Sequence, residues 1–171
     1  MPAGITLTFG ADVAQRIEAT WQALAQAGHG ESMPRLGYVP HLTLAVWPEA
    51  DPPGLAAVAH LVPPWITLAG LGIFPGESAV LWLGVVATPE LLALHRAVLN
   101  AVPAPPHPHY AAGAWMPHVT LAIGLPAGTL PAATAVAAGR YAPMLAAVAT
   151  IEAVTFPPVA VTARVAVPAA A

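Results

Sequence analysis

The chain has 171 residues, of which 57% are hydrophobic and 8% are charged, so it can bury a substantial core and disorder is excluded. Lys and Arg together number five and the net charge is −3, which disfavours a long nucleic acid as partner, because such proteins neutralise many phosphates with basic side chains. A small nucleotide or an RNA end is not excluded. The absence of cysteine excludes disulfides, thiolate nucleophiles and Cys-ligated zinc.

No segment is typical of a membrane span or a secretion signal. Residues 97–139 contain no Asp, Glu, Lys or Arg, but prolines recur throughout this stretch and would break a transmembrane helix. The N-terminal residues show no basic cluster followed by an apolar run and a cleavage site. We therefore expect a cytoplasmic protein without a membrane partner.

The first half of the chain predicts a strand, a helix and a further series of short elements. A strand over residues 5–9 precedes a helix from Asp12 to about residue 27, with Gln15 completing a capping box and Gly28 as the stop. The next predicted elements are a strand at 41–46, a short helix at 55–61 and a hairpin of strands 65–74 and 79–86.

The second half begins with the clearest helix signal. Thr88 and Pro89 are a good cap and first-turn residue for a helix over 90–101, whose apolar stripe includes His95. A connector rich in Pro and His follows at 103–113. The remaining predicted elements are a strand at 118–123, a helix at 130–138 and strands at 148–155 and 161–167.

A ten-residue sequence occurs twice. Residues 38–47 read YVPHLTLAVW and residues 115–124 read WMPHVTLAIG, with Pro, His, Thr, Leu and Ala in the same places. Side chains alternate between the faces of a strand. One face is thus expected to carry a histidine, a threonine and a small residue, and the other to pack on the core: His41, Thr43 and Ala45 against Leu42, Leu44 and Val46, and His118, Thr120 and Ala122 against Val119, Leu121 and Ile123.

A second repeated segment indicates that a whole structural unit is duplicated. Residues 72–76 (GIFPG) and 154–158 (VTFPP) each lead into a further strand. Two copies of a helix-plus-sheet unit, related by a pseudo-two-fold axis, would face their His-x-Thr strands across a shared cleft. A lone half would expose a sheet face, so we expect a single α+β domain over residues 1–171, with two intertwined lobes of antiparallel sheet and helices.

Paired histidines and threonines suit chemistry at phosphorus. With an unperturbed pKa of about 6.5, one histidine can be neutral and the other protonated at working pH, so the two can act as general base and general acid in one in-line displacement. Threonine hydroxyls can donate hydrogen bonds to the non-bridging oxygens in the transition state. This chemistry requires neither a metal nor a nucleophilic residue.

The paired Pro-His-x-Thr-Leu-Ala strands, their spacing and the internal symmetry resemble the 2H phosphoesterase superfamily, in particular its bacterial 2'-5' RNA ligase-like branch. The resemblance runs from the strand at residue 5 to the strand ending at 167. It implies a bilobed α+β fold with a central cleft, and metal- and cofactor-independent reaction with a 2',3'-cyclic phosphate or a 2'-5'-linked phosphodiester on a small nucleotide or RNA end. It also implies that His41 and His118 are the acid and base and that Thr43 and Thr120 bind phosphate.

Hydrolysis is expected to dominate over ligation in water, and symmetry does not decide which histidine is the base. Nor does the sequence decide between two further alternatives. A noncatalytic nucleotide-binding module would keep the same cleft and use the histidines only as phosphate donors. A metal-dependent hydrolase would use His107 and His109, but no nearby carboxylate or cysteine completes a site, and we interpret these two as incidental loop histidines.

The remaining candidates lie beside the motifs. Arg35 is the nearest cation and a candidate phosphate ligand, although an ordinary exposed loop arginine is an equally good interpretation. Aromatic residues flank both motifs and can either stack on a base or pack in the rim, with Tyr38 and Trp115 as candidate substrate contacts beside Trp47 and Tyr110. The other three tryptophans, Trp21, Trp65 and Trp82, are expected in the core. We expect His29, His60 and His95 to pack against neighbours or to cap helices.

Overall fold

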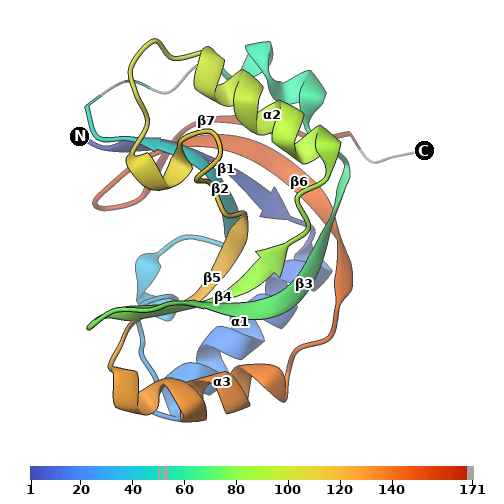
Figure 1. The fold of residues 1–171 in the computed structure, drawn as a ribbon. Coiled ribbons are helices and arrows are strands. Elements are labelled where there is room, and N and C mark those ends of the chain that lie inside the picture. Colours follow the sequence, from blue (N-terminus) through green and yellow to red (C-terminus); the bar gives the residue numbers. More distant parts are fainter. Residues whose placement is uncertain (50, 52–53, 169–171) are drawn as a thin grey trace.

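The computed structural model describes residues 1–49, 51 and 54–168. This part of the chain alternates strands and helices in the order that Figure 1 shows. The strands are β1 (Ala3–Phe9), β2 (His41–Trp47), β3 (Trp65–Phe74), β4 (Ala79–Val85), β5 (His118–Leu125), β6 (Met144–Thr155) and β7 (Ala160–Ala166), and the α-helices are α1 (Ala11–Gln26), α2 (Pro89–Asn100) and α3 (Leu130–Ala138).

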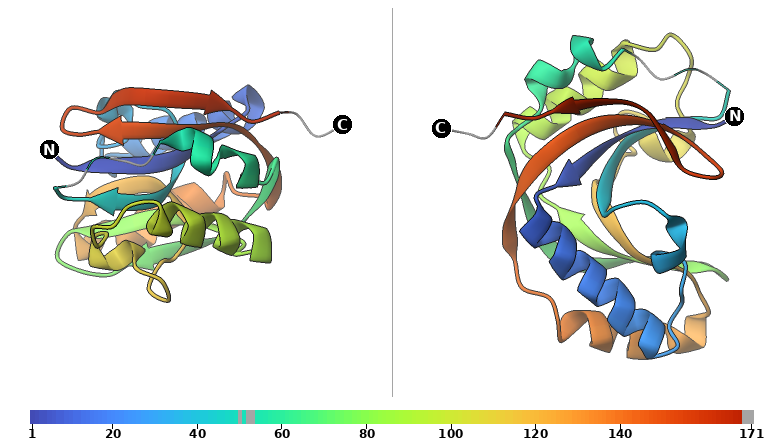
Figure 2. Two further views of the ribbon diagram at one scale, coloured as in Figure 1. Left: turned by 90° about the horizontal axis from the view of Figure 1, so that it is seen from above. Right: turned by 180° about the vertical axis from the view of Figure 1, so that it is seen from behind.

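All the strand pairs are antiparallel and form one strongly curved sheet. Its order is β1-β2-β5-β4-β3-β6-β7, and β1 also pairs with β6. The first part of β6, residues 144–147, pairs with β3, whereas residues 148–155 pair with β1. One lobe therefore consists of β2, β1, the end of β6 and β7, and the other of β5, β4, β3 and the start of β6. Figures 1 and 2 show these two curved layers joined through β6.

The helices connect the lobes crosswise. α1 follows β1 but packs against β5 and α3, on the outside of the other lobe, and α2 follows β4 but packs against β2. Each of these two helices buries a single apolar stripe, as amphipathic helices on a sheet do. The stripes are Val13, Ile17, Thr20, Trp21 and Leu24 in α1, and Leu91, Leu94, His95 and Val98 in α2. The fold is thus α+β and bilobed, with two units related by a pseudo-two-fold axis around a central cleft, as the sequence predicts.

The helix ends test the predicted caps individually. Gly28 ends α1 with φ +75°, and the His29 N–H donates to the Leu24 carbonyl over 2.8 Å, which confirms the predicted stop. The Thr88 hydroxyl accepts from the Leu91 N–H over 3.3 Å, which confirms the cap of α2. The predicted capping box is wrong: the N-cap of α1 is Gly10, without a side-chain cap, so the helix begins one residue before Asp12.

The predicted helix over 55–61 is instead two short 3₁₀ turns, Leu55–Ala57 and Ala59–Leu61. This seven-residue segment is too short to form a stable α-helix without strong packing, so two turns that bury Leu55 and Val58 take its place. None of the helices in the described residues has the length and apolar character needed to cross a membrane.

The two motif strands carry the same β-bulge, which the simple alternation did not predict. In β2 the register with β1 shifts at Leu44, and in β5 the register with β4 shifts at Leu121, so each of these leucines is an extra residue. Beyond the bulge the faces exchange. The expectation that Ala45 and Ala122 share the histidine face is therefore wrong, because both are buried in the core. In their place the next residues along, Val46 and Ile123, line the cleft.

Candidate active site

β2 and β5 lie edge to edge, and both motifs meet at this junction. Leu42 is the register partner of Val119. In an antiparallel pair this register aligns His41 with Thr120 and Thr43 with His118, on the face opposite the two core residues. The expectation that the two strands face each other across the cleft is therefore wrong: they are neighbours.

The cleft above this junction has a volume of about 750 Å³, which is in the range of small-molecule sites. His41, Thr43 and Thr120 line it, whereas His118 is not among its lining residues. Three segments from distant parts of the sequence form its walls, namely the loop after α1, the connector before β5 and the turn between β6 and β7. They contribute Ser32, Met33, Arg35, Leu36 and Tyr38, then His107, His109 and Tyr110, and finally Phe156, Pro157, Pro158 and Val159.

The two motif histidines are held in the same way. The Nδ1 of His41 is 2.8 Å from the Val39 carbonyl oxygen, and the Nδ1 of His118 is 2.7 Å from the Met116 carbonyl oxygen. A carbonyl oxygen only accepts, so Nδ1 must carry the proton in both rings. In the neutral imidazole Nε2 is consequently unprotonated and can accept a proton, and in the imidazolium Nε2–H can donate one. Both histidines thus present the atom that acid–base chemistry needs.

Burial lowers the pKa of both histidines. The pKa of His118 falls because its surroundings remove it from water, although the hydrogen bond to Met116 partly opposes this. Burial is also the main cause for His41, and a positive charge on His118 lowers the pKa of His41 further. The two rings are therefore close enough that each disfavours a second proton. Both shifts favour the neutral imidazoles, and once one ring is protonated its charge opposes protonation of the other.

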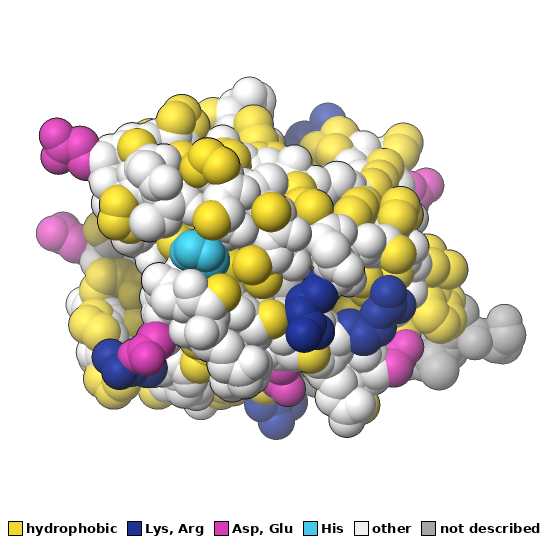
Figure 3. Space-filling model, turned by 90° about the horizontal axis from the view of Figure 1, so that it is seen from below, with side chains coloured by type: hydrophobic (Ala, Val, Ile, Leu, Met, Phe, Trp, Pro, Cys, Tyr) yellow, Lys and Arg dark blue, Asp and Glu magenta, His cyan; other side chains and the backbone are white. Residues whose placement is uncertain are grey.

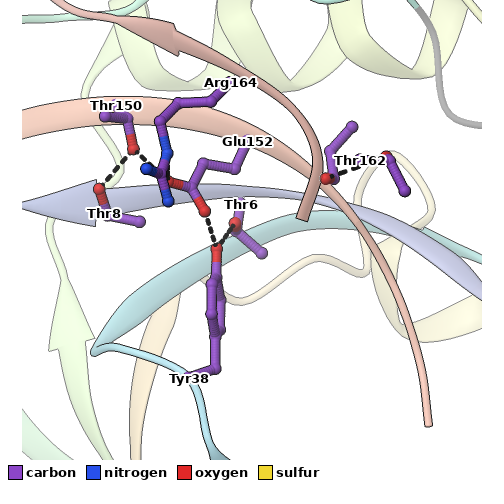
Figure 4. A network of polar contacts seen from close by, with 8 residues as sticks. Thr6, Thr8, Tyr38, Thr150, Glu152, Thr162 and Arg164 are labelled. Atoms are coloured by element: carbon purple, nitrogen blue, oxygen red, sulfur yellow. Dashed lines mark hydrogen bonds and ion pairs between the residues drawn. The ribbon is translucent and has the colours of Figure 1, made fainter. Parts of the chain in front are cut away.

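A polar network joins Tyr38 to residues of β1, β6 and β7 (Figure 4). The Tyr38 ring packs against the His41 ring with centroids 4.9 Å apart, and its hydroxyl donates to Glu152 over 2.6 Å. Glu152 also accepts from Thr150 over 2.9 Å and from Arg164 over 2.5 Å, although its side chain is almost completely buried. Burial alone would raise the pKa of Glu152, but these hydrogen bonds outweigh it and hold that pKa below its ordinary value. The carboxylate raises the pKa of His41.

The corresponding surroundings of His118 are aromatic. The His118 ring makes an edge-to-face contact with Phe74, with centroids 4.9 Å apart, and lies 5.8 Å from the Trp82 ring. Trp82 is the register partner of both Thr120 on β5 and Gly72 on β3. A Cβ at Gly72 would overlap the Trp82 ring, so only glycine allows the indole to lie there. In the other lobe the matching cross-strand pair is Thr6 with Glu152, so the two lobes differ in polarity.

Each motif threonine is also held by a tryptophan from behind. The indole N–H of Trp115 donates to the Thr43 carbonyl over 3.1 Å, and that of Trp21 donates to the Thr120 carbonyl over 3.0 Å. Both carbonyls stand directly before a bulge residue, where the ladder is irregular. The two tryptophans therefore fix the backbone at the same point of the two motifs.

The candidate substrate contacts differ in their positions. Arg35 and Tyr38 line the cleft, and Arg35 forms an ion pair with Glu31 at the surface. Trp115 is not among the residues lining the cleft: its ring stacks on buried His95, 4.1 Å away and almost parallel. The packing expected for His95 is confirmed, but a stacking contact between Trp115 and a base has no support in this geometry.

The three tryptophans expected in the core differ in burial. Trp21 is buried, as predicted, whereas Trp65 is 46% exposed and Trp82 is half-buried beside His118, so for these two the prediction is wrong. Both lie on strands with a face that does not meet the main core. Sequence patterns also did not indicate a role for Glu152 or Phe74. A lone acidic residue inside the apolar strand segment 148–155 was the one available signal for Glu152.

Few charges lie near this cleft. Arg35 is the one charged side chain lining the cleft in the part of the chain that the structure describes. The face over α1 and α3 carries a few basic side chains, two of them side by side, among hydrophobic, uncharged and acidic ones, without a continuous basic surface (Figure 3). Within the described ranges, no three His, Asp or Glu side chains gather as a metal site would require.

Paired antiparallel strands that each carry a His-x-Thr motif beside a cleft, in a bilobed α+β fold, define the 2H phosphoesterase class. A model of the 2'-5' RNA ligase superfamily matches residues 53–156, which is more than half of the chain. The chain belongs to this superfamily, which supports an enzyme acting on phosphoesters. The match contains the second motif, whereas the first lies before it.

No curated protein matches the chain significantly by sequence. A solved structure described as "Structure of Kluyveromyces marxianus Usb1" is similar over 98% of this chain and 97% of that chain, with 11% sequence identity and a TM-score of 0.49.

Proposed function

We propose that the protein is a phosphoesterase that hydrolyses a 2',3'-cyclic phosphate or a 2'-5'-linked phosphodiester, with His41 and His118 as the acid–base pair. The observation that carries the proposal is the matched orientation of the two rings. Each Nδ1 donates to the main-chain carbonyl two residues earlier, so each Nε2 is left to exchange protons. A purely structural histidine would not need the same constraint twice, at the same strand position of two lobes.

The reaction on a cyclic phosphate balances with these groups alone. The Nε2 of the neutral histidine takes a proton from water as the water oxygen attacks phosphorus in line. The bond from phosphorus to one ribose oxygen breaks, and the Nε2–H of the protonated histidine gives its proton to that oxygen. The hydroxyls of Thr43 and Thr120 donate to the non-bridging oxygens, where charge must be stabilised. A phosphate monoester results, and the two histidines have exchanged protonation states.

The unequal surroundings of the two histidines support an assignment of roles. The Glu152 carboxylate partly offsets the burial and the His118 charge that lower the pKa of His41, whereas no carboxylate acts on His118, which lies against Phe74 and Trp82. We therefore assign His41 as the general acid and His118 as the general base when a cyclic phosphate opens. In the reverse direction the roles exchange.

The sparse charge of the cleft supports a small substrate. A long RNA would need several Lys or Arg side chains along its path, and Arg35 is the only such side chain among the described residues that line the cleft. A nucleotide or a short RNA end fits a volume of about 750 Å³. Because each motif comes from a different half of the chain, both halves are needed, and residues 1–171 are proposed to act as one domain.

The proposal is tested by phosphorus NMR of the purified protein with the four nucleoside 2',3'-cyclic monophosphates in the presence of EDTA. A new monoester resonance is expected, and its position identifies the bond broken. His41→Ala and His118→Ala should each lower kcat by about 10²–10⁴-fold. Full activity in both variants would contradict the proposal. Tight calorimetric binding without turnover, for cyclic and 2'-5'-linked substrates alike, would instead indicate a noncatalytic nucleotide-binding module.

A further inference from the structure

The connector before β5 brings two more histidines to the same cleft. His107 and His109 line it together with His41 and Thr43, although they have no part in the acid–base pair. Their rings are in contact, with centroids 4.7 Å apart and an interplanar angle of 74°. The interpretation as incidental loop residues does not account for their position in the cleft. The acid–base reaction leaves both histidines without a role there.

Main-chain and aromatic contacts fix this connector firmly on the motif strand. The His107 N–H donates to the carbonyl of Val46, the residue that the bulge turns toward the cleft, over 2.7 Å. Further along, the Nε2 of buried His95 lies 3.0 Å from the Tyr110 carbonyl oxygen. The backbone that carries the two imidazoles is thus held in place before any ligand arrives, which favours binding.

The hydrogen-bonding pattern also fixes what His107 offers. Its Nδ1 accepts from the His109 N–H over 3.4 Å, so in the neutral ring the proton must sit on Nε2. His107 therefore presents an N–H donor beyond the main chain. No carboxylate lines the described part of the cleft, and Arg35 adds a positive charge to its wall. The nearest carboxylates, Glu31 and Glu152, do not line the cleft and are paired with Arg35 and Arg164, so donors at His107 and His109 suit an anion.

The position of the pair relates it to the reacting phosphate. Val46 stands five residues beyond His41 on the same strand, which at about 3.3 Å per residue separates their backbones by roughly 16 Å. A span of this order can take one nucleoside, with a cyclic phosphate at the His41 end and the 5' oxygen at the His107 end.

We propose that His107 and His109 form a second anion subsite, which binds a phosphate on the 5' oxygen of the substrate nucleoside. That phosphate is either a terminal 5'-monophosphate or the link to a preceding nucleotide; both present the same non-bridging oxygens. This inference rests on the proposed function, since it places the 2',3'-cyclic phosphate at His41 and His118.

The test compares kcat/KM for three substrates: adenosine 2',3'-cyclic phosphate, its 5'-phosphorylated form, and a dinucleotide ending in the same cyclic phosphate. The variants are His107→Asn, whose Oδ1 can accept from the His109 N–H but whose amide N–H does not reach as far as the imidazole Nε2–H, His109→Ala, and the two combined. The control is His60→Ala, an exposed histidine that does not line the cleft.

The wild-type protein should prefer one of the two 5'-phosphate substrates at least tenfold over the plain cyclic phosphate. In the combined variant this preference should fall to within twofold, while kcat/KM for the plain cyclic phosphate stays within twofold of wild type. A preference for the 5'-monophosphate identifies a terminal phosphate as the ligand, and a preference for the dinucleotide identifies the linking one. No preference in the wild type, or a preference that survives in the combined variant, overturns the inference.

If none of the three substrates is hydrolysed, the proposed function fails, and the subsite is then judged separately. Calorimetric titration with adenosine 5'-monophosphate should show at least tenfold weaker binding to the combined variant than to the wild type or His60→Ala. Equal affinity, or no binding to any of them, overturns the inference without reference to turnover.

Discussion

Individual side chains at the floor of the cleft have separable roles, and the threonine hydroxyls are the simplest to isolate. Thr43→Ala and Thr120→Ala each remove a donor to the phosphate but leave the main-chain carbonyl that accepts from tryptophan. We expect kcat to fall about 100-fold in each, because such donors act mainly in the transition state. Steady-state kinetics on a cyclic phosphate measures this, and the serine variants should recover most of the activity.

A control for the threonine variants is Thr129→Ala, which removes a hydroxyl that donates to the Pro126 carbonyl away from the cleft. Its kcat should match the wild type. If the serine variants were as inactive as the alanine variants, the methyl group rather than the hydroxyl would be responsible, and the proposed role of Thr43 and Thr120 would be wrong.

Glu152 is a single residue that can break the equivalence of the two histidines. Glu152→Gln removes the charge that raises the pKa of His41, so that pKa should fall further. A general acid must be protonated to act. With His41 as the acid, the alkaline limb of the kcat/KM profile should therefore move to lower pH. The pH–rate profile measures the shift, and NMR titration of the histidines locates it.

The matched control for Glu152→Gln is Glu90→Gln, which changes an exposed carboxylate in α2. It should leave both limbs of the profile in place. Movement of the acid limb instead of the alkaline limb would exchange the roles and make His41 the base. An unchanged profile would show that the charge of Glu152 does not reach the reaction.

At the scale of elements, the position of Trp82 on β4 depends on Gly72 of the neighbouring strand β3, because this residue has no side chain. Gly72→Ala would place a Cβ inside the volume of the Trp82 ring, so the ring must move and the contact with His118 is disturbed. We expect about 1–3 kcal/mol loss in the free energy of unfolding, as in other overpacked sites, together with about tenfold lower kcat/KM. Urea denaturation and kinetics measure the two effects.

Gly128→Ala serves as the control for this substitution, because a Cβ there meets nothing within 4 Å. It should be neutral in both measurements. Wild-type kcat/KM in Gly72→Ala, despite lower stability, would show that the aromatic wall of His118 has no part in catalysis.

For the whole molecule, the pKa shifts predict how stability depends on pH. Burial lowers the pKa of His41, His95 and His118 below 6.5, and hydrogen bonds hold that of Glu152 below 4.5. The unfolded chain therefore binds more protons than the folded one, first near pH 6.5 and then below pH 4.5, so the free energy of unfolding should fall as the pH decreases from 7 to 4. Urea denaturation at a series of pH values tests this.

The histidine part of this dependence can be separated from the carboxylate part. In a variant carrying both His41→Gln and His118→Gln, the slope between pH 7 and 5 should become smaller, while the decline below pH 4.5 remains. A stability that rises on acidification through this range would contradict the direction of the pKa shifts.

The sequence alone determined most strand and helix positions, apart from the segment 55–61 and the first four residues of β6, and it determined the duplication and the two His-x-Thr motifs. These features are encoded locally: a period of two or 3.6 residues, a cap such as Thr88, or a repeated ten-residue stretch is visible without knowing what packs on it. The membership in a superfamily followed from the same local signal, and so did the α+β class of the fold.

Only the tertiary structure decided how the motifs meet and what surrounds them. The bulges at Leu44 and Leu121 depend on pairing with β1 and β4, so alternation within one strand could not show them. Tyr38 and Glu152 stand 114 residues apart in the chain yet hydrogen-bond, and Trp115 contacts Thr43 across 72 residues. Contacts between residues so distant in sequence are fixed by topology, and the difference between the two histidines arises there.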